Sequence, residues 1–280
     1  MPASPPAPEK SPARAWHAST FLRGSLALHL GAAATVIARP ALWPWALAAV
    51  VADQVLIGGA GLWPRSRLLG PNWTRLPAAA AHAVAITIDD GPDPEVTPRV
   101  LALLAAHQAR ATFFCIGERV RQYPQLAREI LAAGHGLENH TERHSMRFSL
   151  MGPGAITDEV RRAQDSIQGV TGEVAQFFRA PAGLRNPFLA PVLARQNLRL
   201  VSWTRRGFDT VNGDPERILA RLTRALGARD ILLLHDGHAA RTATGTPVIL
   251  EVLPRLLDTL AAARLTPLTL RAAFALAERA

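Results

Sequence analysis

The chain has a single cysteine and a single lysine. The first shortage argues against a disulfide-linked or multi-cysteine metal protein, and the second against a nucleic-acid binder. With Cys115 alone, the chain can form no internal disulfide and no multi-cysteine metal site. Cys115 lies in the apolar run 111–116, so we expect a buried, inert thiol. Lys10 is the only lysine among 31 basic residues, and the arginines are dispersed without a basic, aromatic-rich stripe. The net charge of +9 therefore predicts a solvated arginine surface and no nucleic-acid partner.

The first 76 residues differ in composition from the rest. Residues 1–15 are rich in proline, alanine and serine, which predicts a disordered tail. Residues 16–76 carry two apolar stretches, 24–38 and 41–63, and we expect an apolar helical segment there. The first is short for a full span and resembles the core of a signal peptide. The second is long enough to cross a bilayer, although Asp53 would have to face a partner or water.

Three arrangements of residues 16–76 are open: a two-helix membrane hairpin, one spanning helix, or an amphipathic pair packed on the domain. We favour membrane attachment, at a bacterial inner membrane. The side on which the remaining chain lies stays open. A hairpin would leave it in the cytoplasm by the positive-inside rule, whereas a single span by 41–63 would face it outward.

Residues 77–280 alternate short β-like runs with helix-like runs. This alternation predicts an α/β fold with a parallel sheet, closed or nearly closed into a barrel. The expected strands are 84–88, 111–116, 176–178, 198–203, 231–234 and 267–270. The expected helices are 98–107, 123–133, 155–168, 187–195, 215–226 and 248–263.

Two adjacent carboxylates, Asp89 and Asp90, follow the first expected strand and precede Gly91-Pro92. A turn at a strand end can bring both into one cleft, where one can bind a metal and the other act as a base. Alone, the segment would be an ordinary turn. The later segments favour the chemical interpretation.

His140 and His144 are four residues apart and would share one face of a helical turn. Two imidazoles and one carboxylate form the open geometry of a catalytic metal site. We therefore expect one divalent ion, with zinc as first choice and cobalt, nickel or iron as alternatives. For His82, His107, His135 and His238, which lack such spacing, we expect structural or solvated roles.

Arg179 and His235 also follow apolar runs. An arginine at a strand end can clamp a carboxylate with its planar fork. His235 follows the apolar run 231–234, and its position favours a general acid aimed into the cleft over a core histidine.

These segments, in this order, resemble the polysaccharide deacetylases of carbohydrate esterase family four, the NodB-homology domain. The resemblance covers about 84–270 and implies a distorted (β/α) barrel and metal-dependent removal of an acyl group from a sugar. It implies roles for matching positions, which are as follows: Asp89 as base, Asp90, His140 and His144 as metal ligands, Arg179 as the residue orienting the base, His235 as general acid, and Leu233 in the acyl pocket, with Pro181 and Trp203 as further substrate contacts.

The fourth segment departs from the family pattern, Asp-x-x-x-Trp, because Arg206 and Thr210 stand there. The family's aspartate supports the catalytic histidine, so we expect Asp209 to substitute for it. Glu138 also stands where the family has a glycine, close to the expected histidine ligands.

We therefore expect a metal-dependent hydrolase that removes an N-acyl group, most simply acetyl, from an amino-sugar glycan or lipid-linked sugar. The enzymatic alternative is a deformylase or another amide C–N hydrolase on the same barrel. A non-catalytic carbohydrate-binding module is the alternative of another class. It would predict erosion at Asp89, Asp90 or His235, and all three are intact.

Overall fold

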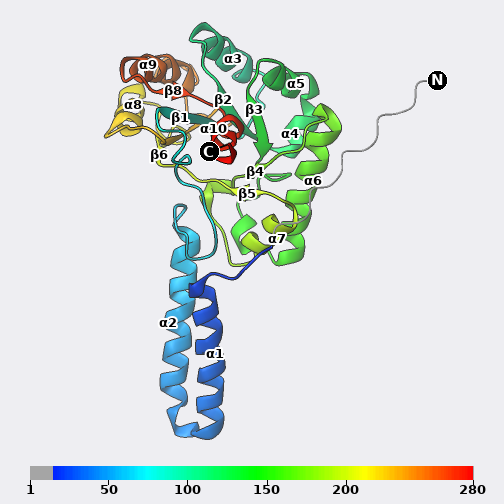
Figure 1. Ribbon diagram of the computed structural model, residues 1–280, viewed down its shortest axis with the longest axis vertical. Coiled ribbons are helices and arrows are strands. Elements are labelled where there is room, and N and C mark those ends of the chain that lie inside the picture. The colour runs from blue at the N-terminus through cyan, green and yellow to red at the C-terminus, as the bar shows by residue number, and fades with distance from the viewer. Residues whose placement is uncertain (1–14, 280) are drawn as a thin grey trace, which may run out of the picture.

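The protein consists of a helical stalk and an α/β body (Figure 1). The structure, a computed structural model, describes residues 15–279. The tail expected at 1–15 therefore lies, except for its last residue, outside the described residues.

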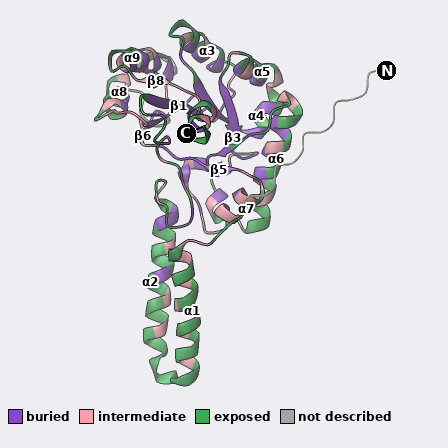
Figure 2. Ribbon diagram, viewed as in Figure 1, coloured by how far each residue is buried: buried purple, intermediate pink, exposed green. Residues whose placement is uncertain are grey.

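Two antiparallel helices form the stalk: α1 (Thr20–Ala38) and α2 (Trp43–Leu62), with the short turn η1 (Pro40–Leu42) between them. They correspond to the two apolar stretches of the sequence. Arg39 ends α1 with φ −143°, as expected for a residue that precedes a proline. Both helices are long and apolar enough to cross a membrane, and most of their residues are exposed (Figure 2).

The segment after α2, residues 63–82, packs along the body. The Trp73 ring meets the edge of the Phe274 ring, with centroids 4.8 Å apart. Arg75 donates to the Asp230 carboxylate at 2.9 Å, and Leu76 is fully buried. The last part of the expected helical segment, 63–76, is thus not helical, and it packs on the body as a chain of turns and irregular structure.

The body is built on one parallel sheet. Its strands are β1 (Ala83–Asp89), β2 (Ala111–Cys115), β3 (Gly136–Asn139), β4 (Phe177–Phe178), β5 (Arg199–Leu200), β6 (Arg205–Arg206), β7 (Ile231–His235) and β8 (Thr266–Pro267). The order is β5-β4-β3-β2-β1-β7-β6, and β8 pairs with the start of β1. Within 15–279 no pairing joins β5 to β6, so the curved sheet is a half-barrel. The expected distorted (β/α) barrel is confirmed.

Helices cover the outside of the half-barrel (Figure 1). They are α3 (Thr97–Ala106), α4 (Gly117–Gln122), α5 (Pro124–Ala132), α6 (Pro153–Thr171), α7 (Leu189–Arg195), α8 (Pro215–Thr223) and α9 (Ile249–Ala262), with short 3₁₀ turns η2 (Phe148–Leu150) and η3 (Pro181–Gly183). The last helix, α10 (Leu270–Glu278), packs instead against the core inside the half-barrel.

Four short elements are missing from the sequence expectation: β3, β6, α4 and α10. The expected strand at 267–270 is wrong in its second half, because the Thr269 hydroxyl accepts from the backbone of Ala272 at 3.1 Å and starts α10 there.

Side-chain alternation along β1 divides the interior into two cores. Val84, Ile86 and Ile88 point outward into the large core beneath the helices. Ala83 and Ala85 point into a second core inside the half-barrel, which α10 closes from below. Because side chains alternate along a strand, the same inner face continues through Thr87 to Asp89. The fold thus directs Asp89 into the mouth of the half-barrel.

Candidate active site

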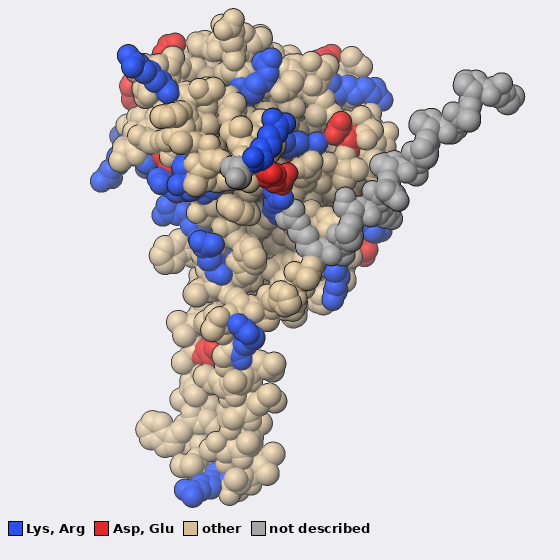
Figure 3. All heavy atoms as spheres, in the orientation of Figure 1, with Lys and Arg blue, Asp and Glu red and all other residues tan. Residues whose placement is uncertain are grey.

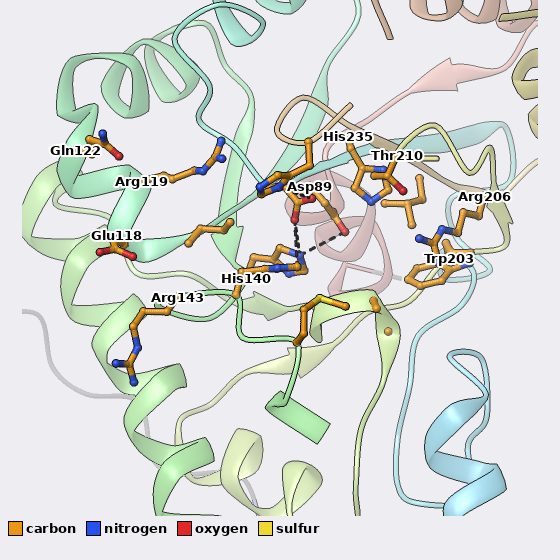
Figure 4. Close-up of a pocket in the computed structure, with 18 residues that line it drawn as sticks. Asp89, Glu118, Arg119, Gln122, His140, Arg143, Trp203, Arg206, Thr210 and His235 are labelled. Carbon is orange, nitrogen blue, oxygen red and sulfur yellow. Dashed lines mark ion pairs between the residues drawn. The ribbon is translucent and has the colours of Figure 1, made fainter. Parts of the chain in front are cut away.

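The expected functional side chains gather at the carboxyl ends of the parallel strands (Figure 4). β1 ends at Asp89 and β7 at His235, while His140 and Arg179 directly follow β3 and β4. Parallel strands present these ends at one edge, where barrel enzymes assemble their active sites. Asp89, His140 and His235 line an open pocket of about 560 Å³ there.

Arg179 is buried behind the pocket and holds one oxygen of Asp89. Its Nη1 donates to Asp89 Oδ1 at 2.7 Å and to Thr87 Oγ1 at 2.8 Å. Its other nitrogens donate to two backbone carbonyls at 3.2 and 3.0 Å. Burial lowers the pKa of Arg179, and the Asp89 charge opposes this shift. With Oδ1 held, Asp89 Oδ2 is left on the side of His140, 3.8 Å from its Nε2.

His140 and His144 lie in an irregular loop after β3, so the expected helical turn is wrong. Thr141 and His144 adopt positive φ values of 67° and 51°, which fold the loop back. The Asn139 side chain accepts from the backbone of Thr141 at 2.9 Å and steadies this turn. The two imidazole rings still meet, with centroids 4.8 Å apart. The His140 Nδ1 lies 2.8 Å from the carbonyl oxygen of Arg179, so Nδ1 carries the proton and Nε2 presents its lone pair.

Asp90 completes a group with these two histidines. Its φ of 74° turns its side chain toward the cleft that Asp89 also faces. Asp90 Oδ1 lies 3.3 Å from His140 Nε2 and 3.2 Å from His144 Nε2. This oxygen is buried and has no hydrogen-bond partner among the described residues. Ligands about 2.1 Å from a tetrahedral zinc ion lie about 3.4 Å apart, so the three residues fit one divalent cation.

The electrostatics of this group also suit a cation. Burial works against ionisation of Asp90, but the nearby His140 and His238 rings outweigh it and hold its pKa well below the usual range. Burial, together with the charge of His140, lowers the pKa of His144 to about 4. Near neutral pH the group therefore offers a charged carboxylate and a neutral imidazole of His144.

His235 is held by Asp209 through two contacts. Its backbone N–H donates to Asp209 Oδ2 at 2.7 Å, and its Nδ1 lies 2.8 Å from Asp209 Oδ1. Burial lowers the pKa of His235, but the charge and hydrogen bond of Asp209 prevail and raise it to about 9. The ring nitrogen Nε2 is left for the pocket. The structure thus brings Asp209 to His235, as the sequence leads one to expect.

The walls of the pocket include two of the three expected substrate contacts. Leu233 and Trp203 line it, whereas Pro181 is buried beside it and its neighbours Ala182 and Gly183 form the surface. Gly183 has a φ of 74°, and a Cβ there would come within 2.6 Å of the Trp203 ring. The backbone therefore approaches this wall more closely than a larger residue would allow.

His238 and Arg206 are among the pocket residues that the sequence did not indicate as functional. His238, for which a structural or solvated role is expected, lines the pocket with its Nδ1 3.4 Å from Asp90 Oδ2, and its side chain is 59% exposed. Its position three residues after His235 was the available signal. Arg206 also lines the pocket. Glu138, by contrast, accepts from Arg271 of α10 at 2.6 Å and braces the fold below the site.

A parallel half-barrel with an Asp-His-His group that fits a divalent ion, and with a buried Asp–His pair at its strand ends, is the arrangement expected of a metal-dependent hydrolase. The sequence model described as polysaccharide deacetylase matches residues 78–201. A chitooligosaccharide deacetylase of Bradyrhizobium sp. (strain ANU 289) is 34% identical over 161 residues, which cover 57% of this chain and 73% of that protein. A peptidoglycan-N-acetylglucosamine deacetylase of Bacillus cereus is 34% identical over 175 residues, covering 62% and 81%.

Comparison with a solved structure also indicates similarity to carbohydrate esterases of family 4. The family 4 carbohydrate esterase from Streptomyces lividans, in complex with acetate, superposes with a TM-score of 0.60 and 31% identity. The match covers 67% of this chain and 92% of that one. The chain belongs to the polysaccharide deacetylase family, carbohydrate esterase family four, and is a carbohydrate deacetylase.

Proposed function

We propose that the protein is a membrane-attached N-deacetylase of an amino-sugar glycan or a lipid-linked amino sugar. The observation that carries its metal chemistry is the buried Asp90 Oδ1, which lacks a hydrogen-bond partner among the described residues and lies between two imidazole nitrogens. Asp90, His140 and His144 would hold the ion, zinc by preference. When bound, a divalent ion there supplies Lewis-acid polarisation of the acyl carbonyl and of the attacking water.

Asp89 acts as the general base in this proposal. Arg179 fixes its Oδ1, so Oδ2 accepts the proton of the water that attacks the acyl carbon. Fixing the carboxylate in advance lowers the cost of orienting it during the reaction.

His235 acts as the general acid. The C–O bond forms first, and the electron pair of the carbonyl double bond moves to its oxygen. When this tetrahedral species collapses, the double bond re-forms, the C–N bond breaks and the departing nitrogen takes the proton of His235 Nε2. Protonation is needed because an amine anion is too poor a leaving group to depart unassisted. Asp209 at Nδ1 keeps the ring oriented and favours its charged form. The products are acetate and a free amino sugar.

Leu233 and Trp203 give the pocket an apolar wall suited to an acyl methyl group. The relatives named above are deacetylases of N-acetylated glycans, which supports acetyl as the group removed.

The position of the stalk supports the proposal that the substrate lies at a membrane. The carbonyl oxygen of Pro64, two residues after the end of α2, accepts from the Ser202 hydroxyl at 2.7 Å. Its ring lies beside Gly183, where an added Cβ would come 2.7 Å from it. The wall of the pocket that contains Trp203 therefore adjoins the end of the apolar stalk, where a lipid-linked sugar would arrive. We propose residues 16–76 as the anchoring part and 77–280 as the catalytic part, with 64–76 packed between them.

Acetate release tests this function. The purified full chain is given an N-acetylated chitooligosaccharide, a peptidoglycan fragment and a polyprenyl-linked N-acetylamino sugar, with and without chelator. We expect acetate from at least one substrate, lost with chelator and restored by zinc. Formate from N-formyl sugars without any acetate would favour a deformylase. No acyl release after metal reloading would contradict the proposal.

A further inference from the structure

Arg206 presents a cation to the active-site pocket from the wall that holds the expected acyl-binding residues. It is paired with Leu233 in the register of β6 and β7, and both side chains line the pocket. Figure 4 shows Arg206 beside Trp203, on the same side as Thr210 and His235. The wall that contacts the acyl group thus also carries a guanidinium group.

The guanidinium of Arg206 is held by rings and not by acids. Its Cζ lies 5.3 Å from the centroid of the Trp203 ring and 4.9 Å from that of the Phe208 ring. Among residues 15–279 no carboxylate pairs with it, and its buried Nε has no hydrogen-bond partner. A buried donor that is left unpaired costs free energy, so a ligand that pairs with it gains affinity.

Other arginines around the site do have acidic partners. Arg143 donates to Glu159 at 2.8 Å, and Arg119 lies 3.5 Å from Asp93. Arg205, next to Arg206 in the chain, is paired with Asp230 at 2.5 Å. Arg206 therefore differs from Arg119 and Arg143, which also line the pocket, in having no carboxylate partner among the described residues.

We propose that Arg206 binds an oxyanion of the substrate, a phosphate or a carboxylate, close to the acyl group that is removed. This inference rests on the proposed deacetylase function and specifies its substrate. A guanidinium fork pairs bidentately with either oxyanion, and the two aromatic rings keep its plane oriented.

The chemistry of amino sugars provides two such anions. In a 2-acylamino sugar, a phosphate on carbon 1 or a carboxylate-bearing ether on carbon 3 lies one carbon from the amide-bearing carbon. The first occurs in a lipid-linked sugar and the second in a muramic-type sugar. Uncharged chitooligosaccharides have neither.

The connection to the stalk lies on the Arg206 side of the pocket. Arg65, which follows α2, donates to the backbone carbonyl of Thr204 at 3.3 Å, two residues before Arg206. A phosphate that joins a sugar to a membrane lipid would reach this wall first. We therefore expect substitution of Arg206 to affect a sugar phosphate more than a sugar carboxylate.

Arg221 offers a matched control. Its Cζ lies 5.3 Å from the same Phe208 ring, but it does not line the pocket. Arg206→Gln and Arg221→Gln remove the same charge from the same ring, and Arg206→Lys keeps a charge without the fork. Circular dichroism of each variant checks that it is folded.

The experiment compares acetate release by the metal-loaded full chain from three probes: N-acetylglucosamine 1-phosphate, N-acetylmuramic acid and N-acetylglucosamine. We expect Arg206→Gln to lower the kcat/KM ratio of a charged probe to the neutral one by about 10- to 100-fold, as expected for loss of a charge-assisted hydrogen bond. Most of the loss should be in KM. Arg206→Lys should recover part of the ratio, and Arg221→Gln should leave it unchanged. A ratio that is equal in the wild type and Arg206→Gln for both anions would overturn the proposal.

Binding separates this inference from the proposed function. Calorimetry with N-acetylglucosamine 1-phosphate and N-acetylmuramic acid should show affinity for at least one probe that falls about tenfold or more in Arg206→Gln and not in Arg221→Gln. If neither these probes nor the oligosaccharide, peptidoglycan and lipid-linked substrates named above release acetate, the proposed function is in error, and the calorimetry still decides the role of Arg206. Equal affinity of the wild type and Arg206→Gln for both probes would refute that role.

Discussion

The stalk and the body of this protein distribute their polar and apolar residues in opposite ways. In the body, apolar side chains fill two cores, and charged residues are scattered over the surface (Figures 2 and 3). In the stalk, Leu30 is 64% and Trp45 76% exposed, while Asp53 is buried between the helices. Figure 3 shows the stalk as an almost uncharged surface. A helical pair of this kind is stable where its surroundings are apolar.

The polar contacts inside the stalk explain how its two helices stay together. Asp53 of α2 accepts from the hydroxyl of Ser25 in α1 at 2.5 Å. Gln54 and His29 form a second link at 3.0 Å between the amide Nε2 and the ring Nε2. Polar pairs of this kind join helices where lipid replaces water, since apolar packing alone gives no preference over lipid tails. The body, in contrast, is held by burial of apolar area.

The largest expected effect comes from removing the metal-binding group, which should abolish the activity of the body and leave the membrane association of the stalk intact. We expect His140→Ala with His144→Ala to remove bound metal and essentially all turnover, because two of three ligands are gone. Membrane association should stay as in the wild type, since the stalk is untouched. Elemental analysis, acetate release and membrane sedimentation measure the three quantities. Full metal content in the double variant would refute the assignment.

The two aspartates should differ in a second, smaller effect within the body. Asp89→Asn should keep the metal and lower kcat by about 10²–10⁴-fold, the usual contribution of a general base. Asp90→Asn should lose metal as well as activity. Metal content measured on both variants decides this, and identical values would mean that the division of roles is wrong.

The sequence predicts the chemistry of the body better than its local structure. The strand-end rule indicates Asp89, Arg179 and His235, because apolar strands are visible in sequence and parallel strands align their ends. The loop that carries His140 is not predictable in this way, since positive φ values at Thr141 and His144 depend on tertiary contacts.

The other differences between the sequence expectation and the structure also arise from tertiary contacts. β6 has two residues and is set by pairing with β7, so it has no periodicity of its own. Pro181 is deflected from the pocket by the 3₁₀ turn that carries Ala182 at φ 53°. Arg206 and His238 enter the pocket through tertiary placement, which the periodicity of the sequence does not reveal.

A third prediction concerns the boundary between stalk and body. A truncated protein that starts at Pro64 should stay in the supernatant and remain active, whereas one that starts at Pro77 should be less stable. The second loses the buried Leu76 and the Trp73 ring contact. The expected cost is about 2–5 kcal/mol in the free energy of unfolding, the range for loss of one buried leucine. Urea unfolding of the two truncated proteins measures this cost, and equal midpoints would show that 64–76 adds nothing to the stability of the body.

The full chain, in contrast to the truncated proteins, should pellet with membranes even after a high-salt wash.

The smallest expected effect is a shift in pH dependence. His235 must be protonated to act as the general acid, so activity falls as the pH rises through its pKa, which Asp209 raises to about 9 against the opposing effect of burial. Asp209→Asn removes the charge that favours the imidazolium and leaves burial, which disfavours it. The pKa of His235 should therefore fall, and the alkaline limb of the kcat/KM profile should move to lower pH by about 1–3 units. Because Asp209 lies beyond the metal group, metal content should stay unchanged. An unshifted alkaline limb, together with an inactive His235→Ala, would mean that another group sets the protonation of this histidine.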